Sequence, residues 1–103
     1  MKLHVGQTMC SAVDGTAVIV VRCPDQDVTL TCGGREMSPQ ATAPTTRVPA
    51  LTGAPGDGAL IGKRYATGDG ALEVLCVRPG EYPVAADGIT LATKAPRPLP
   101  ASD

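Results

Sequence analysis

The clearest hydrophobic pattern of this chain lies in residues 7–37, where three short apolar runs are separated by two turn signals. The middle run, residues 16–23 (TAVIVVRC), is rich in β-branched side chains, which pack well on a pleated strand. Asp14-Gly15 before it is a strong signal for a two-residue hairpin, and residues 24–27 (PDQD) after it are typical of a four-residue turn. The pattern therefore predicts a three-stranded antiparallel meander over residues 1–37.

The two turns fix the predicted register and, with it, the two faces of the meander. They place both Cys10 and Cys32 opposite Ile19, and side chains then alternate between the faces. The more apolar face is predicted to be the core, and it carries Thr8, Cys10, Ala12, Ala17, Ile19, Val21, Cys23, Val28, Leu30 and Cys32. The apolar residues of the opposite, outer face are Met9, Val13, Val18 and Val20.

The rest of the chain changes character after the meander. Residues 38–58 contain four prolines and are predicted to form a long Pro-rich loop. Residues 59–94 read as a second hairpin around residues 67–70 (TGDG), followed by a last strand. We therefore expect one all-β domain over residues 1–94, a small sandwich or part-open barrel of about 6–7 short antiparallel strands. Residues 95–103 are predicted to be an extended tail, and no internal repeat is evident.

Composition narrows the classes of function. The net charge is −1, and the aromatic residues are two tyrosines without Trp or Phe, which argues against binding to nucleic acid or to an anionic membrane. No apolar run is long enough to span a membrane, and the N-terminus lacks the apolar core of a secretory signal. We therefore expect a cytoplasmic protein whose four cysteines stay reduced.

Residues 8–10 (TMC) and 29–37 (TLTCGGREM) resemble the desulforedoxin type of rubredoxin-like domain. In that family a Cys-x-x-Cys on the first strand and a Leu-x-Cys-Cys-Gly-x-x-Met segment hold one iron through four thiolates. The resemblance implies an iron or zinc site made by Cys10 and Cys32, together with Cys23 or Cys76. The sequence departs from the family at two ligand positions, where Val13 and Gly33 stand.

The residues themselves favour a different role for the cysteines. In the predicted register Cys10 and Cys32 lie roughly 9–10 Å apart, and Cys23 lies roughly 13 Å along the sheet, whereas a shared metal needs every sulfur within about 2.3 Å of the ion. Free cysteine commonly fills a core as a small apolar side chain. Core thiols are therefore the main prediction, a metal site is the alternative, and a redox role is a third possibility.

No catalytic constellation is present, because the single histidine, His4, lies near the terminus and is expected to be solvated. We expect a small non-enzymatic accessory or protein-binding domain without a cofactor. It would bind a partner protein or a second copy through Met9, Val13, Val18 and Val20 and through the Pro-rich segments. The alternative is a desulforedoxin-like zinc or iron protein.

Overall fold

The computed structural model describes residues 2–42, 46–56 and 58–93, which form ten short strands and a single 3₁₀ turn, η1 (Gln40–Thr42). The prediction of a small all-β domain is confirmed. The strands are β1 (Thr8–Cys10), β2 (Ala17–Arg22), β3 (Leu30–Cys32), β4 (Arg35–Glu36), β5 (Ser38–Pro39), β6 (Arg64–Ala66), β7 (Glu73–Arg78), β8 (Val84–Ala86), β9 (Ile89–Thr90) and β10 (Ala92–Thr93). The predicted tail, residues 95–103, lies outside the described residues.

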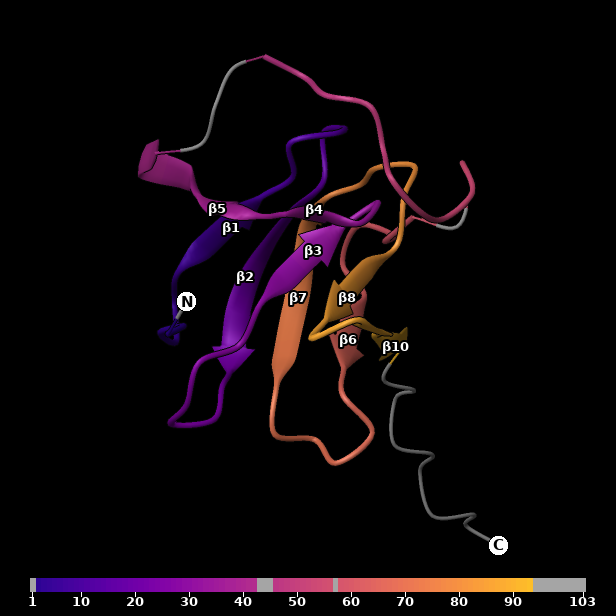
Figure 1. Cartoon of the computed structure of the whole chain (residues 1–103). Coiled ribbons are helices and arrows are strands. Elements are labelled where there is room, and N and C mark those ends of the chain that lie inside the picture. Colours follow the sequence, from indigo (N-terminus) through magenta and orange to yellow (C-terminus); the bar gives the residue numbers. More distant parts are fainter. Residues whose placement is uncertain (1, 43–45, 57, 94–103) are drawn as a thin grey trace, which may run out of the picture.

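The strands form two antiparallel sheets. The larger has the order β10-β6-β7-β2-β1-β5, and the smaller has the order β4-β3-β8-β9. The smaller sheet lies in front of the middle of the larger one (Figure 1). The core between them is made mainly by Met9, Val18, Val20, Val74 and Cys76 from the larger sheet and Leu30, Cys32, Val84 and Ala86 from the smaller one.

This core corrects the predicted facing of the first two strands. Val18 and Val20 are 0% exposed and point inward, whereas Ile19 and Val21, predicted to be core, are only partly buried. The pairing of β1 with β2 is also shifted by two residues, since Cys10 lies opposite Ala17 and not Ile19. Because this shift preserves the two faces, the error lies in the side on which the second sheet packs. Both faces of β2 are apolar, so alternation alone could not decide it.

The predicted meander is wrong at its third strand. β2 does not pair with β3; its second neighbour is β7, with Val18 opposite Cys76 and Val20 opposite Val74. β3 crosses to the smaller sheet, where it pairs with β4 and β8. A strand as apolar as β2 is stabilised by neighbours on both edges and by a covering sheet, and this crossover supplies the cover.

The turn at Asp14-Gly15 also differs from the prediction. Residues 11–16 form a wider loop, closed by the Ser11 N–H donating to the Thr16 carbonyl at 2.9 Å, and neither Asp14 nor Gly15 has a positive φ. Two other dipeptides adopt the type I′ geometry instead: Gly33-Gly34 (φ 61° and 83°) and Asp87-Gly88 (φ 49° and 84°). They join β3 to β4 and β8 to β9.

The second half follows its predicted hairpin more closely. β6 and β7 pair around residues 67–70, with Tyr65 opposite Val74. The predicted last strand is divided at the buried residue Leu91 into β9 and β10, which belong to different sheets. Within the predicted Pro-rich loop, β5 pairs with β1 at the edge of the larger sheet.

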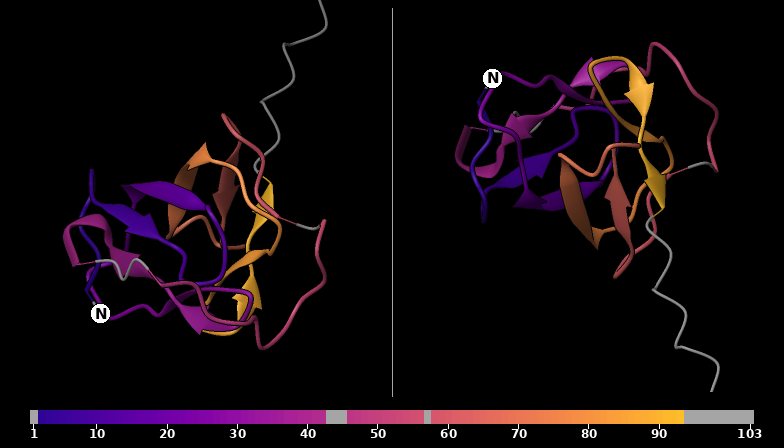
Figure 2. Two further views of the ribbon diagram at one scale, coloured as in Figure 1. Left: turned by 90° about the horizontal axis from the view of Figure 1, so that it is seen from above. Right: turned by 90° about the horizontal axis from the view of Figure 1, so that it is seen from below.

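The two halves of the chain repeat one another, which the sequence did not reveal. If β1–β5 exchange places with β6–β10, each in turn, both sheets keep the same strand order, read from the opposite edge. In both views of Figure 2 the indigo-to-magenta half and the orange-to-yellow half lie side by side.

Backbone hydrogen bonds recur in matched pairs. Gly6 N donates to Val20 O as Gly62 N donates to Cys76 O, Met37 N donates to Leu30 O as Leu91 N donates to Val84 O, and Ser11 N donates to Thr16 O as Thr67 N donates to Leu72 O. The chain therefore has a pseudo-two-fold axis between β2 and β7. Few matched positions keep the same residue, among them Gly6 and Gly62, Val18 and Val74, Val21 and Val77, Arg22 and Arg78, and Gly34 and Gly88.

Candidate functional site

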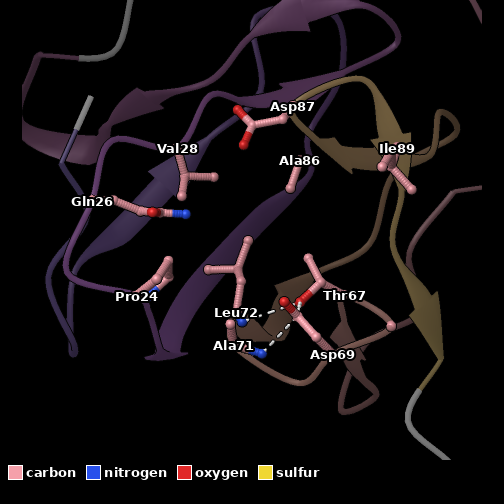
Figure 3. A pocket seen from close by; sticks show the side chains of 11 residues that line it. Pro24, Gln26, Val28, Thr67, Asp69, Ala71, Leu72, Ala86, Asp87 and Ile89 are labelled. Carbon is pink, nitrogen blue, oxygen red and sulfur yellow. Dashed lines mark hydrogen bonds between the residues drawn. The ribbon is translucent and has the colours of Figure 1, made fainter.

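A pocket of about 350 Å³ opens at one end of the second half, between the β6–β7 loop, the β8–β9 turn and the connection from β2 to β3 (Figure 3). Its floor is apolar and is made by Val28, Leu72 and Ala86. Each of these three residues is at most 5% exposed, so the floor belongs to the core of the domain. The walls and rim are Pro24, Gln26, Thr67, Gly68, Asp69, Ala71, Asp87 and Ile89.

Asp69 shapes the wall that the β6–β7 loop provides. Its Oδ1 accepts hydrogen bonds from Thr67 Oγ1 at 2.6 Å and from Ala71 N–H at 3.0 Å, which Figure 3 shows as part of one network. The hydrogen bond from the Thr67 side chain, followed by that from the Ala71 backbone, lowers the pKa of Asp69. The loop is therefore held by a carboxylate that stays ionised at neutral pH.

Asp87 shapes the opposite wall. Its positive φ of 49° suits the first position of a type I′ turn, and its Oδ1 accepts a hydrogen bond from Thr29 N–H at 2.9 Å. Ile89 follows it on β9 and is 69% exposed at the rim. The residues lining the pocket include two acidic side chains and no basic one, so the pocket carries negative charge.

The matching place in the first half is filled. There the Asp14 carboxylate lies between the 11–16 loop and the chain that leaves β7. Its Oδ2 accepts hydrogen bonds from Glu81 N–H at 2.8 Å and Tyr82 N–H at 3.0 Å, and its Oδ1 accepts one from Thr16 N–H at 2.9 Å. Partial burial would raise the pKa of Asp14, but these hydrogen bonds and the neighbouring Thr16 hydroxyl outweigh burial and lower it to about 2.

Sequence reasoning gave Asp14 only a local turn role, because its partners lie far along the chain. Thr16 Oγ1 is buried beside this carboxylate and has no partner with hydrogen-bond geometry among the described residues. A side chain at Gly80 would collide with this hydroxyl and with Asp14, so the close approach of the two segments requires glycine there.

The four cysteines are free and are dispersed through the fold. Cys32, in β3, is buried; its Sγ donates to Tyr82 O at 3.3 Å. Cys76, in β7, is also buried, and its Sγ donates to Arg78 O at 3.1 Å. Burial raises the pKa of both thiols, so they remain protonated. Cys10 and Cys23 are partly buried.

These positions do not form the ligand set that the alternative prediction needs. Among the described residues, which include all four cysteines, no group of three or more His, Cys, Asp or Glu side chains could hold a metal ion. The register fixes Cys10 at Ala17 in the larger sheet and Cys32 at Arg35 and Val84 in the smaller one. The structure therefore does not bring Cys10 and Cys32 together with Cys23 or Cys76.

The predicted binding face is also corrected. Met9, Val18 and Val20 are at most 1% exposed, because the smaller sheet of the same chain covers them. Val13 is partly buried and packs against the same core. The face is apolar because it packs inside the domain. The sequence did not indicate the pocket beside Ile89, because the lining of that pocket comes from three distant segments.

The described part of the chain contains no helix with the length and apolar character needed to span a membrane. No protein-family model, curated protein or solved structure matches this chain. The desulforedoxin resemblance therefore stays a prediction, and the function is argued from the geometry of the pocket.

Proposed function

We propose that this chain is a non-enzymatic binding domain that docks a segment of a partner protein in the pocket between the β6–β7 loop and the β8–β9 turn. The observation that carries the proposal is an apolar floor lying beside an open sheet edge. β9 ends the smaller sheet, and within the described residues no strand lies on its outer side.

The chemistry of the pocket suits a peptide. Contact with Val28, Leu72 and Ala86 would remove apolar surface of the partner from water, which is the main favourable term in association. The backbone of an edge strand offers hydrogen-bonding groups to an extended chain laid beside it. Ile89, 69% exposed at the rim, adds an apolar contact next to that edge.

The polar side chains of the pocket support binding because they hold its shape. Asp69 and Asp87 are each hydrogen-bonded to backbone N–H groups of their own or a neighbouring turn. Walls fixed in this way lower the conformational entropy lost when a partner binds. As part of the same proposal we place the protein in the cytoplasm, where its free cysteines would stay reduced.

A photocrosslinking amino acid at position 89 tests the proposal in cells of the source organism. We expect a discrete adduct with one partner protein from position 89 and none from position 5, where Val5 is similarly exposed (68%) but does not line the pocket. The blocking variant is Gly68→Phe, because a side chain at Gly68 meets no neighbour within 4 Å and would extend over the mouth of the pocket.

The adduct at position 89 should disappear in the Gly68→Phe background while the protein stays folded by circular dichroism. Equal labelling from positions 5 and 89, an adduct that survives Gly68→Phe, or no adduct at all would each contradict the proposed function.

A further inference from the structure

The first half of the chain shows what covers this kind of site. Residues 46–52, which we call the strap, bridge the β1–β2 loop and the β3–β4 turn. Val48 N–H donates to Ala12 O at 2.9 Å, and the N–H groups of Leu51 and Thr52 donate to Gly33 O at 2.6 and 3.0 Å. The strap is thus bound by backbone hydrogen bonds to two carbonyl groups on opposite sides of the site.

Side chains reinforce the strap. Arg35 Nε donates to Pro49 O at 2.9 Å. A carbon added at Gly33 would meet the Ala50 side chain at 3.0 Å, and one added at Gly34 would meet Leu51 at 3.0 Å and Thr52 at 2.8 Å. The strap therefore lies directly on the β3–β4 turn.

The pseudo-two-fold axis relates the strap-covered site of the first half to the pocket of the second half. The matched hydrogen bonds that close the two loops (Ser11 to Thr16 and Thr67 to Leu72) place Gly68 at the position of Ala12. The type I′ turns and the reciprocal hydrogen bonds Gly33 N to Pro83 O and Asp87 N to Thr29 O place Asp87 at the position of Gly33. Gly68 and Asp87 both line the pocket.

The second half lacks a strap within the described part of the chain. Neither the Gly68 nor the Asp87 carbonyl accepts a backbone hydrogen bond from the residues described. A carbon added at Gly88, the counterpart of Gly34, would meet nothing within 4 Å. The pocket is therefore a strap site whose two anchoring carbonyl groups are available.

A second difference between the two halves leaves the pocket of the second half open. Gly70 stands where Asp14 stands in the first half, so no carboxylate draws the β2–β3 connection inward as Asp14 draws Glu81 and Tyr82. Pro24, Gln26 and Val28 of that connection consequently line a pocket.

We propose that the pocket binds an extended segment of a partner protein that has the chemistry of the strap, an inference that rests on the proposed function and names the partner's chemistry. The segment carries a basic residue, then a residue with a free N–H, then proline. Its backbone donates to the Gly68 and Asp87 carbonyl groups as Val48 and Leu51 donate in the first half.

The negative charge of the pocket favours a basic residue in the partner segment. Arg47 of the strap lies beside Gly15, with a guanidinium nitrogen 4.0 Å from a carbon added there. The counterpart of Gly15 is Ala71, whose N–H is bonded to Asp69, so a basic side chain at this position of the partner meets a carboxylate. Asp87 on the other wall adds a second negative charge.

Proline fits at the third position because Pro49 contributes only its carbonyl group to the strap. The chain's other Pro-rich sequence, residues 95–103, has Pro98 directly after Arg97, and Pro98 has no N–H to donate at the position of Val48. The required order therefore favours a partner protein as the source of the segment.

The test is a titration of the ¹⁵N-labelled full-length protein with the synthetic peptide TRVPALTG, the sequence of residues 46–53. We expect chemical-shift changes in residues 67–72 and 87–89. N-methylation of the peptide at the Val48 or Leu51 position should weaken binding by about tenfold, the effect of a lost hydrogen bond.

The contribution of the pocket's negative charge to peptide affinity is tested with a protein variant that combines Asp69→Asn and Asp87→Asn. Asparagine keeps a side-chain oxygen for both turns and accepts the positive φ at position 87, so the fold is retained. Binding should weaken by about fivefold at low salt. The matched control, Glu36→Gln, removes an exposed charge on β4 and should leave the affinity unchanged.

Three results would overturn this inference: no shift at millimolar peptide, shifts confined to the first-half site around residues 12–15 and 33–35, or binding insensitive to N-methylation. In each case the photocrosslink at position 89 still decides the proposed function. A partner adduct without peptide binding would mean that the pocket takes a segment of different chemistry.

Discussion

At the scale of single residues, Asp14 and Gly70 make the two halves of the chain different. Asp14 joins two loops that are far apart in sequence through its bonds to Glu81 and Tyr82, and at Gly70 there is no side chain to do so. This carboxylate, together with the strap, therefore distinguishes the closed site from the open one.

Asp14 should give the protein a pH-dependent stability. Its pKa falls from an ordinary value of 3.8 to about 2 on folding. The stabilisation is therefore complete above about pH 4 and is lost as the pH falls through about 2. Because the group is partly exposed, we expect Asp14→Asn to lower the free energy of unfolding by about 1–2 kcal/mol at pH 7.

Urea unfolding at pH 7 and pH 3 measures this difference, which should shrink at the lower pH. Asp25→Asn is the control, since its bond with Lys2 (2.7 Å) lies on the surface and contributes roughly 0–1 kcal/mol. An Asp14→Asn variant as stable as the parent at pH 7 would show that the Asp14 bonds do not stabilise the fold.

At the scale of elements, the two type I′ turns set the edges of the smaller sheet. Gly33-Gly34 joins β3 to β4 under the strap, and Asp87-Gly88 joins β8 to β9 at the rim of the pocket. Asp87 is the one non-glycine residue with a positive φ among those described, and its carboxylate also accepts a hydrogen bond from Thr29.

We expect Asp87→Ala to destabilise the protein by about 1–3 kcal/mol. Alanine adopts a positive φ at a cost of about 1–2 kcal/mol, and Thr29 N–H would lose its acceptor. Asp87→Asn should stay within about 0.5 kcal/mol of the parent, because asparagine tolerates this conformation. Thermal unfolding of both variants checks the order, and equal melting temperatures would contradict the role assigned to this turn.

At the scale of the whole molecule, each half depends on the other. The central pair of the larger sheet is β2 with β7, and the central pair of the smaller sheet is β3 with β8, so both sheets cross the boundary between the halves. A single half would expose the apolar side chains of Val18, Val20 and Leu30 to water.

Separate fragments of residues 1–56 and 57–103 should therefore lack dispersed amide signals at micromolar concentration, and mixing them should restore the spectrum of the intact chain. The intact chain should unfold in one cooperative transition, seen by circular dichroism and by amide signals together. A fragment that folds as a monomer would contradict this interdependence.

Part of the fold could be predicted from local sequence. The β-branched residues of β2 and the hairpin around residues 67–70 depend on backbone preferences within a few residues, and the structure has both. The candidate site was not predictable in this way, because Val28, Leu72 and Ala86 come from three segments and meet only in the folded chain.

The sequence by itself determined that the protein is all-β and where β2 and the β6–β7 hairpin occur, because these follow from φ/ψ preferences and side-chain branching. Only the tertiary structure decided which face of β2 is buried, since both of its faces are apolar and the packing of the second sheet chooses between them. It also decided the pairing of β2 with β7, the long-range role of Asp14 and the matching of the two halves. These features depend on contacts between residues far apart in the chain, which local preferences cannot encode.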